Sequence, residues 1–173
     1  MSFLASSVNR SRLLRFSLFS LLFLSVSLFA LAQLNLKFRM LAGYALGEEA
    51  SLNKGKSTVF VFEQEETFNQ VFKPAGASGK RPDQPNFGRE MVIGIAVPPT
   101  KTPPKLSVSK IFVQDSTLTV RYIRMADSTY IKNPLPTPSS PSLVVAIPKQ
   151  TVLRTKLVEN GRVVQTIRKH DTE

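Results

Sequence analysis

The sequence predicts an α+β fold: one domain over residues 33–173, with a mostly antiparallel β-sheet, one short helix packed on it and a C-terminal β-hairpin. Two continuously apolar runs, Met91–Val97 and Leu143–Ile147, indicate inner strands that are covered on both faces. Other segments alternate between apolar and polar residues, as half-buried strands do. The helix is indicated by apolar residues that recur at helical spacing between Glu63 and Lys73.

The first 32 residues have the layout of a secretory signal peptide. Three arginines without any acidic residue precede the apolar run Phe16–Leu31, and the segment ends on Ala30-Leu31-Ala32. A membrane-spanning helix needs about 20 apolar residues, so a retained anchor is the less favoured alternative. We expect cleavage after Ala32 and an exported protein, periplasmic or secreted, that is soluble and meets a membrane only if the segment stays uncleaved.

The first strands of the domain are expected on either side of a loop. Leu34–Leu41 alternates, with Leu34, Leu36, Phe38 and Met40 on one side, which is typical of a strand. Gly43–Lys56 is polar and rich in glycine, so it is interpreted as a loop. Ser57–Phe62 is β-branched and aromatic and is expected to be the next strand.

The short helix follows directly. Phe68, Val71 and Phe72 lie at i, i+3 and i+4 and would press onto the sheet, and glutamates precede them where the helix dipole favours negative charge. Pro74 should end this helix after Phe72 or Lys73.

The second half reads as strands joined by turns and proline-rich loops. Leu106–Val113 alternates but changes phase near Lys110, which indicates a one-residue β-bulge. Thr117–Arg124 alternates regularly and would place Leu118, Val120 and Tyr122 in the core. The last two strands flank Asn160-Gly161, a pair typical of a type I′ turn, which would set Glu159 opposite Arg162 and Val158 opposite Val163.

Composition limits the chemistry that this domain can perform. Residues 33–173 contain no cysteine, and His170 is the only histidine, so neither disulfides nor metal sites of the His/Cys kind are expected. No pair of carboxylates and no glycine-rich phosphate loop stands out. We therefore expect a protein that is not an enzyme and needs no cofactor or metal, with a hydrolase as the least favoured hypothesis.

The block Glu90–Lys149 resembles a known family. Its order is the apolar strand after Glu90, a strand ending at Ile111, a hairpin into Leu118–Tyr122, and a long proline-containing loop before Leu143–Lys149. This resembles the C-terminal domain family named after PrcB, a lipoprotein subunit that stabilises a secreted protease complex. The family's Gly-Gly-Tyr turn is replaced here by Lys101–Leu106. The resemblance implies an exported accessory protein, with a protease as one possible kind of partner.

The leading hypothesis is an exported protein that binds another envelope or secreted protein through two proline-stiffened loops, Pro98–Lys105 and Ala126–Ser142. The alternative for these prolines is that they only keep the loops from pairing with other strands. The candidate partner-binding residues are Pro98, Lys101, Pro103, Pro104, Tyr130, Lys132, Pro134 and Pro136.

A second hypothesis rests on charge. Without the leader, which holds three of the 23 basic residues and none of the 12 acidic ones, the net charge is 20 − 12 = +8. Such a domain could bind anionic envelope polysaccharide or a membrane surface through Lys73, Lys80, Arg81 and Arg89, although a solvated soluble surface is the simpler explanation. Nucleic acid is not expected as a partner outside the cytoplasm.

The signal-peptide hypothesis predicts a defined mature N-terminus. Sequencing of the exported protein should begin at Gln33, because small residues at positions 30 and 32 favour cleavage there. A product that still carries the three leader arginines would contradict the hypothesis.

Overall fold

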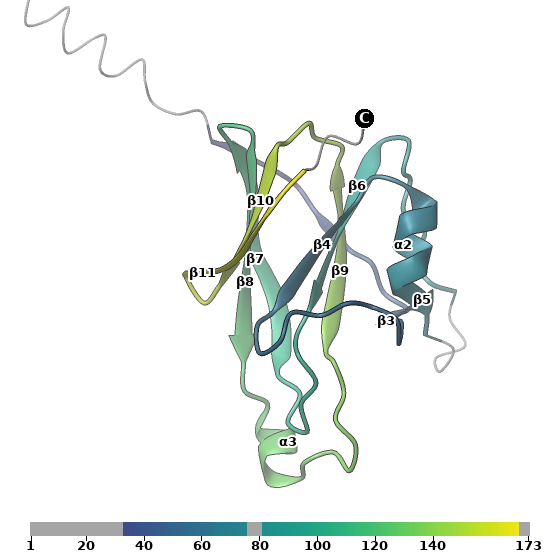
Figure 1. Cartoon of the computed structure of the whole chain (residues 1–173), viewed down its shortest axis with the longest axis vertical. Coiled ribbons are helices and arrows are strands. Elements are labelled where there is room, and N and C mark those ends of the chain that lie inside the picture. Colours follow the sequence, from purple (N-terminus) through teal and green to yellow (C-terminus); the bar gives the residue numbers. More distant parts are fainter. Residues whose placement is uncertain (1–32, 76–80, 170–173) are drawn as a thin grey trace, which may run out of the picture. The chain divides into compact units, whose positions relative to one another are not determined.

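The computed structural model describes residues 33–75 and 81–169, which form one mostly β-sheet domain with few helices (Figure 1). This agrees with an α+β or a mostly-β fold. The expected signal segment, Lys80 and His170 lie outside the described residues. Among the helices that the structure describes, none is long and apolar enough to cross a membrane.

The described elements follow one another along the chain as two short helices among eleven strands. In order they are β1 (Leu34–Asn35), β2 (Arg39–Met40), β3 (Tyr44–Leu46), β4 (Thr58–Phe62), α2 (Glu65–Val71), β5 (Phe72–Pro74), β6 (Glu90–Ala96), β7 (Lys105–Gln114), β8 (Thr117–Met125), α3 (Ser128–Lys132), β9 (Ser142–Pro148), β10 (Arg154–Glu159) and β11 (Arg162–Arg168).

The strands form two main sheets and a small ribbon, where the sequence suggested one sheet. The five-stranded sheet has the order β1-β7-β8-β10-β11, the four-stranded sheet has the order β2-β9-β6-β4, and β3 pairs with β5. All pairs are antiparallel except β8 with β10. The inner strands β6 and β9 of the four-stranded sheet are apolar on both sides, so each face of that sheet needs cover. The five-stranded sheet covers one of these faces.

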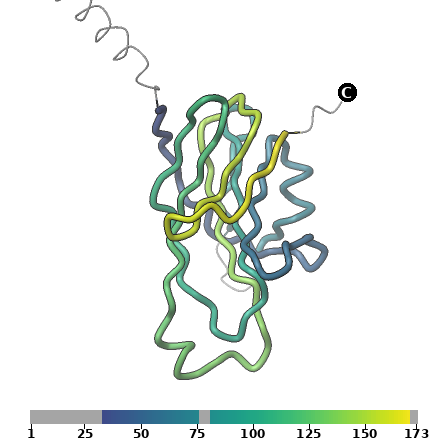
Figure 2. Tube along the Cα trace, turned by 60° about the vertical axis from the view of Figure 1, so that its left-hand side comes forward, coloured from purple at the N-terminus to yellow at the C-terminus, as the bar shows by residue number. Residues whose placement is uncertain are grey.

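The four-stranded sheet is the middle layer of the domain (Figures 1 and 2). On one face, Met91, Ile93 and Val145 pack against the five-stranded sheet in the larger core cluster. On the other face, Val92 and Val144 pack beneath α2 in a second cluster. Met91–Val97 and Leu143–Ile147 are thus buried inner strands, and that prediction is confirmed.

The second cluster is largely aromatic. Phe68 of α2 and Phe72 are buried as expected, with ring centroids 5.7 Å apart, and Phe62 packs edge-on to Phe68 at 5.4 Å. The predicted end of the helix is wrong by at least one residue, since α2 ends at Val71. Phe72 is already extended because Phe72–Pro74 pairs with β3. Strand β3 lies within Gly43–Lys56, the segment that the sequence predicted to be a loop.

The expected strand Leu34–Leu41 is divided between the two sheets. Leu34–Asn35 pairs with β7 of the five-stranded sheet, whereas Arg39–Met40 pairs with β9 of the four-stranded sheet. The alternating side chains therefore do not share one buried face. Leu34, Phe38 and Met40 are exposed, whereas Leu41 is buried and packs in the aromatic cluster.

Two local features of the five-stranded sheet follow the sequence. The β7–β8 register shifts between Val108 and Lys110, which places a bulge where the phase change predicted one. At the C-terminal end, β10 and β11 pair with Glu159 opposite Arg162. Asn160 and Gly161 between them have φ angles of 48° and 84°. The Asn160 side chain also bonds both backbone groups of Arg124, at 3.0 Å each.

The expectation of a single helix is wrong, because the loop Ala126–Ser142 contains α3. Asp127 caps it by accepting a hydrogen bond from the Thr129 N–H at 3.0 Å. Five residues are too few for an apolar period to reveal a helix in the sequence.

Gly94 provides a test of the aromatic packing. A β-carbon there would lie 2.7 Å from Cζ of Phe72, whose side chain is fully buried, so the ring would have to shift. We expect Gly94→Ala to lower the free energy of unfolding by about 1–3 kcal/mol in urea titrations.

The double variant Gly94→Ala/Phe72→Leu isolates the cause. Leucine vacates the ring's space, so the alanine should cost less in that background than in the wild type. Equal costs in both backgrounds would contradict a clash with Phe72.

Candidate functional site

The two proline-rich loops meet in one structure, here called the loop lobe (residues 98–104 and 126–141), which extends beyond one end of the sheets (Figure 1). Thr100 and Ser139 exchange backbone hydrogen bonds of 2.9 and 3.0 Å. The Leu135 N–H donates to the Lys101 carbonyl at 2.8 Å. Both loops connect the two main sheets at the same end, so the fold brings them together.

The lobe is tied to the sheet at Asp127. Besides capping α3, its carboxylate lies 3.5 Å from the ammonium of Lys105, the first residue of β7. The hydrogen bond from the Thr129 N–H, with a smaller contribution from Lys105, lowers the pKa of Asp127. This carboxylate therefore has a structural role in fixing the helix against the strand.

All eight residues predicted for partner binding lie in the loop lobe. The exposed ones are Lys101, Lys132, Pro134 and Pro136, and the half-buried ones are Pro98, Pro103, Pro104 and Tyr130. Ile131, which is 59% exposed at the lobe's surface, is not among the residues predicted from the sequence. An isolated apolar residue in a polar loop was the signal that could have identified it.

A buried polar cluster joins the two sheets at another place. The Tyr122 hydroxyl donates to a Glu159 carboxylate oxygen, and it lies 2.7 Å from the hydroxyl of Ser57. Ser57 is also 2.7 Å from the same carboxylate oxygen, and Arg124 lies 3.5 Å from the other one.

The pKa values of this cluster follow from its burial and hydrogen bonds. Burial, reinforced by the Glu159 carboxylate, raises the pKa of Tyr122 well above its ordinary value. Burial also acts to raise the pKa of Glu159, but hydrogen bonds from Tyr122 and Ser57 together with Arg124 outweigh it, so this pKa is lowered. Ser57 and Tyr122 are 1% exposed, and a substrate has no access to them. The cluster fastens β4 to the five-stranded sheet.

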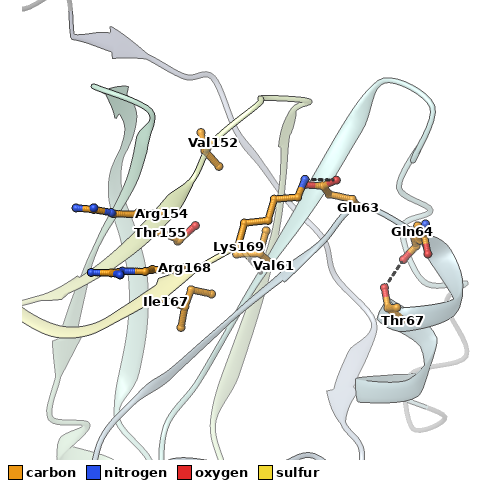
Figure 3. A pocket seen from close by; sticks show the side chains of 10 residues that line it. All are labelled: Val61, Glu63, Gln64, Thr67, Val152, Arg154, Thr155, Ile167, Arg168 and Lys169. Atoms are coloured by element: carbon orange, nitrogen blue, oxygen red, sulfur yellow. Dashed lines mark hydrogen bonds and ion pairs between the residues drawn. The ribbon is translucent and has the colours of Figure 1, made fainter. Parts of the chain in front are cut away.

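A pocket of about 320 Å³ lies between the edge strands β4 and β11 (Figure 3). Val61, Val152 and Ile167 provide its apolar part. Lys169 crosses it to pair with Glu63 at 2.7 Å. This volume is at the small end of the range for ligand sites, and its one acid–base pair is already neutralised.

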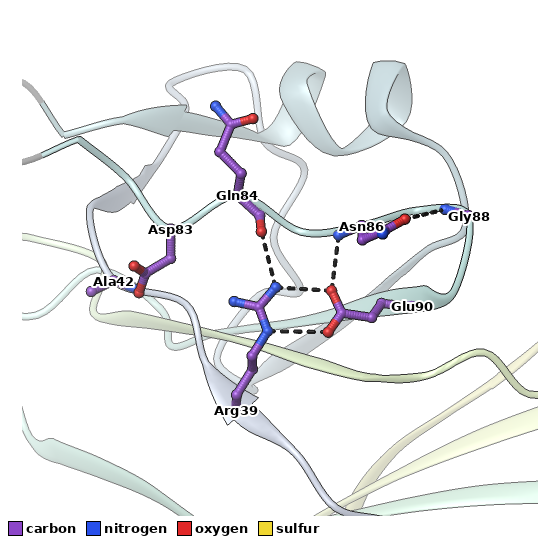
Figure 4. A network of polar contacts seen from close by, with 7 residues as sticks. All are labelled: Arg39, Ala42, Asp83, Gln84, Asn86, Gly88 and Glu90. Carbon is purple, nitrogen blue, oxygen red and sulfur yellow. Dashed lines mark hydrogen bonds and ion pairs between the residues drawn. The ribbon is translucent and has the colours of Figure 1, made fainter.

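A second polar network fixes the loop before β6 (Figure 4). Arg39 donates to both carboxylate oxygens of Glu90, at 3.1 and 2.8 Å, and to the Gln84 carbonyl at 2.9 Å. The Asn86 N–H donates to the same carboxylate at 2.8 Å. The bond to Arg39 is the largest cause of the lowered pKa of Glu90. The geometry is that of a structural clamp.

The basic patch expected from the sequence does not emerge as a built site. Lys73 donates to the Asn69 carbonyl at 2.6 Å, Arg81 and Arg89 are exposed in the loop before β6, and Lys80 is outside the described residues. Five other basic residues share the outer face of the five-stranded sheet. They are Lys110, Arg121, Arg154, Lys156 and Arg168, here called the cationic face.

The sequence contained only part of the signal for the cationic face. Arg154 and Lys156 alternate with buried Thr155 and Leu157, which marks them as outward-facing. That they join Arg121 depends on the parallel pairing of β8 with β10, which no local pattern specifies.

Comparisons with known proteins yielded no match: no family model, no curated protein and no solved structure is significantly similar to this chain. In the part of the chain that the structure describes, no group of three or more His, Cys, Asp or Glu side chains is arranged to hold a metal ion.

Replacement of Tyr122 by Phe tests the buried cluster through pH. A carboxylate whose pKa is lowered by folding stabilises the protein above its unfolded pKa, about 4.5, and this stability is lost as the pH falls through the folded pKa. Tyr122→Phe removes a hydrogen bond to Glu159 and should cost about 1–3 kcal/mol at pH 7. The difference from wild type should narrow below pH 4.5.

Urea unfolding at pH 7 and pH 3.5 measures both values. Tyr130→Phe is the matched control, since that hydroxyl has no hydrogen-bond partner among the described residues and its loss should cost little at either pH. A difference for Tyr122→Phe that is the same at both pH values would show that Glu159 does not depend on this hydroxyl.

Proposed function

We propose that the protein is an exported, non-enzymatic accessory protein that binds a protein partner through the loop lobe. The observation that supports this most is the backbone pairing of Thr100 with Ser139, which joins two loops distant in sequence into one ordered surface. The residues named from the sequence as partner-binding all belong to that surface.

Preorganisation supports a binding role. The prolines restrict the backbone, and the hydrogen bonds of Thr100, Ser139 and Leu135 hold both loops before any partner arrives. Binding there costs less conformational entropy than binding to free loops would, because the loops are already ordered. The same bonds make deletion of the loop a poor test, because Ser139 and Leu135 hold the rest of the lobe.

The chemistry of the lobe favours an apolar recess on the partner. Ile131 is exposed on α3 beside Lys132, and the exposed Pro134 follows in the chain. Binding energy in protein interfaces concentrates in a few central side chains surrounded by weaker contacts. In this proposal Ile131 is the anchor, and Lys101 and Lys132 lie at the rim.

The resemblance of Glu90–Lys149 to the PrcB C-terminal domains suggests a secreted protease as the class of partner. Both connections of the loop lobe fall within that block. The loop Pro98–Pro104 overlaps Lys101–Leu106, the segment that stands where the family has its Gly-Gly-Tyr turn. This chain would therefore contact a partner with side chains other than those of that turn.

A photo-crosslinking amino acid at position 131 tests the proposed function. The exported protein should crosslink from this position to one discrete partner in its native envelope or culture fluid. Leu153 is the matched control because it is equally exposed, at 59%, and lies outside the lobe. Equal crosslinking from both positions, or none from position 131, would overturn the assignment of the lobe.

Substitution of the anchor gives a quantitative version. With the identified partner, Ile131→Asp should weaken binding on the order of 30-fold or more, as expected for a central apolar contact. It should leave the thermal midpoint within about 2 °C, since the side chain is mostly exposed. Leu153→Asp should change neither value, and a peptide or glycan hydrolysis lost on one carboxylate substitution would instead indicate an enzyme.

A further inference from the structure

The outer face of the five-stranded sheet carries its cations in a regular grid. The register places Gln114, Thr117, Arg154 and Arg168 in one row across β7, β8, β10 and β11. The next row is Phe112, Thr119, Lys156 and Thr166, and the third is Lys110, Arg121, Val158 and Val163. Each row therefore contributes at least one cation, and the five form a band that crosses all four strands.

These cations are not neutralised within the described residues. The ion pairs there involve Arg39, Lys105, Arg124 and Lys169, and none involves the cationic face. The four strands contain one acidic residue, Glu159, and its carboxylate points to the other side of the sheet, toward Tyr122 and Ser57. Outside these strands, Asp115 in the β7–β8 turn is the acidic residue nearest along the chain to the cationic face among the residues that the structure describes.

Two of the contacts within the face are like-charge pairs. Arg154 lies directly opposite Arg168, and Lys110 lies directly opposite Arg121. Figure 3 shows the guanidinium groups of Arg154 and Arg168 side by side, pointing away from Val61 and Lys169. Like charges opposite each other destabilise a sheet, although Lys110 and Arg121 each also contact the ring of Phe112. A bound polyanion would relieve the repulsion.

We propose that the cationic face binds a linear anionic polysaccharide that lies across the strands. Neighbouring strands are about 4.8 Å apart and alternate residues along a strand about 6.7 Å apart, so the grid covers about 14 by 13 Å. A chain crossing it diagonally meets cations on successive strands, with the hydroxyls of Thr117 and Thr166 beside them. Carboxylates match the cations, and sugar hydroxyls match the threonines.

The nature of the face distinguishes a polysaccharide from other polyanions. Single-stranded nucleic acids need exposed aromatic rings for base stacking. The one ring on this grid, Phe112, is buried beneath Lys110 and Arg121, which lie 5.3 and 5.4 Å from its centroid. Anionic membranes favour apolar side chains among the cations. Val163, at the β11 edge of the third row, is the one large apolar side chain that the grid exposes, and the exposed Ile123 and Met125 lie past that row, toward the loop lobe.

Binding of the whole protein to polygalacturonate, measured by titration at several salt concentrations, tests the proposal. We expect Arg154→Gln/Arg168→Gln to weaken binding about 30-fold near 0.1 M salt, at about fivefold for each cation. The dependence of affinity on salt should become shallower as well. Lys110→Gln/Arg121→Gln, at the opposite row, should give a similar loss.

Arg81→Gln/Arg89→Gln is the matched control, because it removes the same charge from two exposed residues outside the grid. A loss in this control equal to that in the face variants would show that only net charge matters and would overturn the proposal. Tighter binding to phosphatidylglycerol vesicles or to a DNA duplex than to polygalacturonate, lost in the same variants, would also overturn it.

A thermal melt of each variant separates binding from folding. The Arg154→Gln/Arg168→Gln variant should melt at the wild-type temperature or slightly above it, because a like-charge pair is removed. Retained polygalacturonate affinity in both folded face variants would show that the grid is not the site.

Discussion

Burial of the four-stranded sheet on both faces is the constraint on which the rest of the structure depends. Met91, Val92, Ile93 and Val145 are all fully buried, although successive residues of a strand point to opposite faces. Two separate covers are therefore needed. The five-stranded sheet provides one, and α2 with the β3–β5 ribbon provides the other through the aromatic cluster.

The stacking of the two main sheets also explains why the loop lobe exists. The chain passes from the four-stranded sheet to the five-stranded sheet between β6 and β7, and it returns between β8 and β9. Both connections lie at the same end, and the Thr100–Ser139 pairing converts them into one unit. A surface assembled in this way rests on buried strands, which gives the proposed partner a rigid platform.

The polar groups of the domain divide into those that the fold uses and those that it does not. Ser57, Tyr122 and Glu159 hold the sheets together at the β4 edge, where the Val59 N–H also donates to the Gln165 side chain at 2.6 Å. Arg39 and Glu90 fix the loop before β6. The cationic face, in contrast, places Arg154 opposite Arg168 and Lys110 opposite Arg121, an arrangement that favours a bound polyanion more than it favours stability.

Local sequence patterns and tertiary strand pairing determine different features of this structure. The sequence by itself determined the two inner strands, the inward residues of β8, the bulge near Lys110 and the burial of Phe68 and Phe72, because each depends on hydrophobic period or a local phase change. It also placed all eight partner-binding candidates in the loops that form the lobe. The sequence did not predict that the strands form two main sheets.

Only the tertiary structure decided how these elements combine. The division of Leu34–Leu41 between two sheets, the end of α2 at Val71 and the meeting of Thr100 with Ser139 all depend on partners far away in the chain. The cationic face depends on the parallel pairing of β8 with β10, which unites Arg121 with Lys156. Local periodicity records which side of a strand is buried, but strand neighbours are selected by the packing of the whole domain.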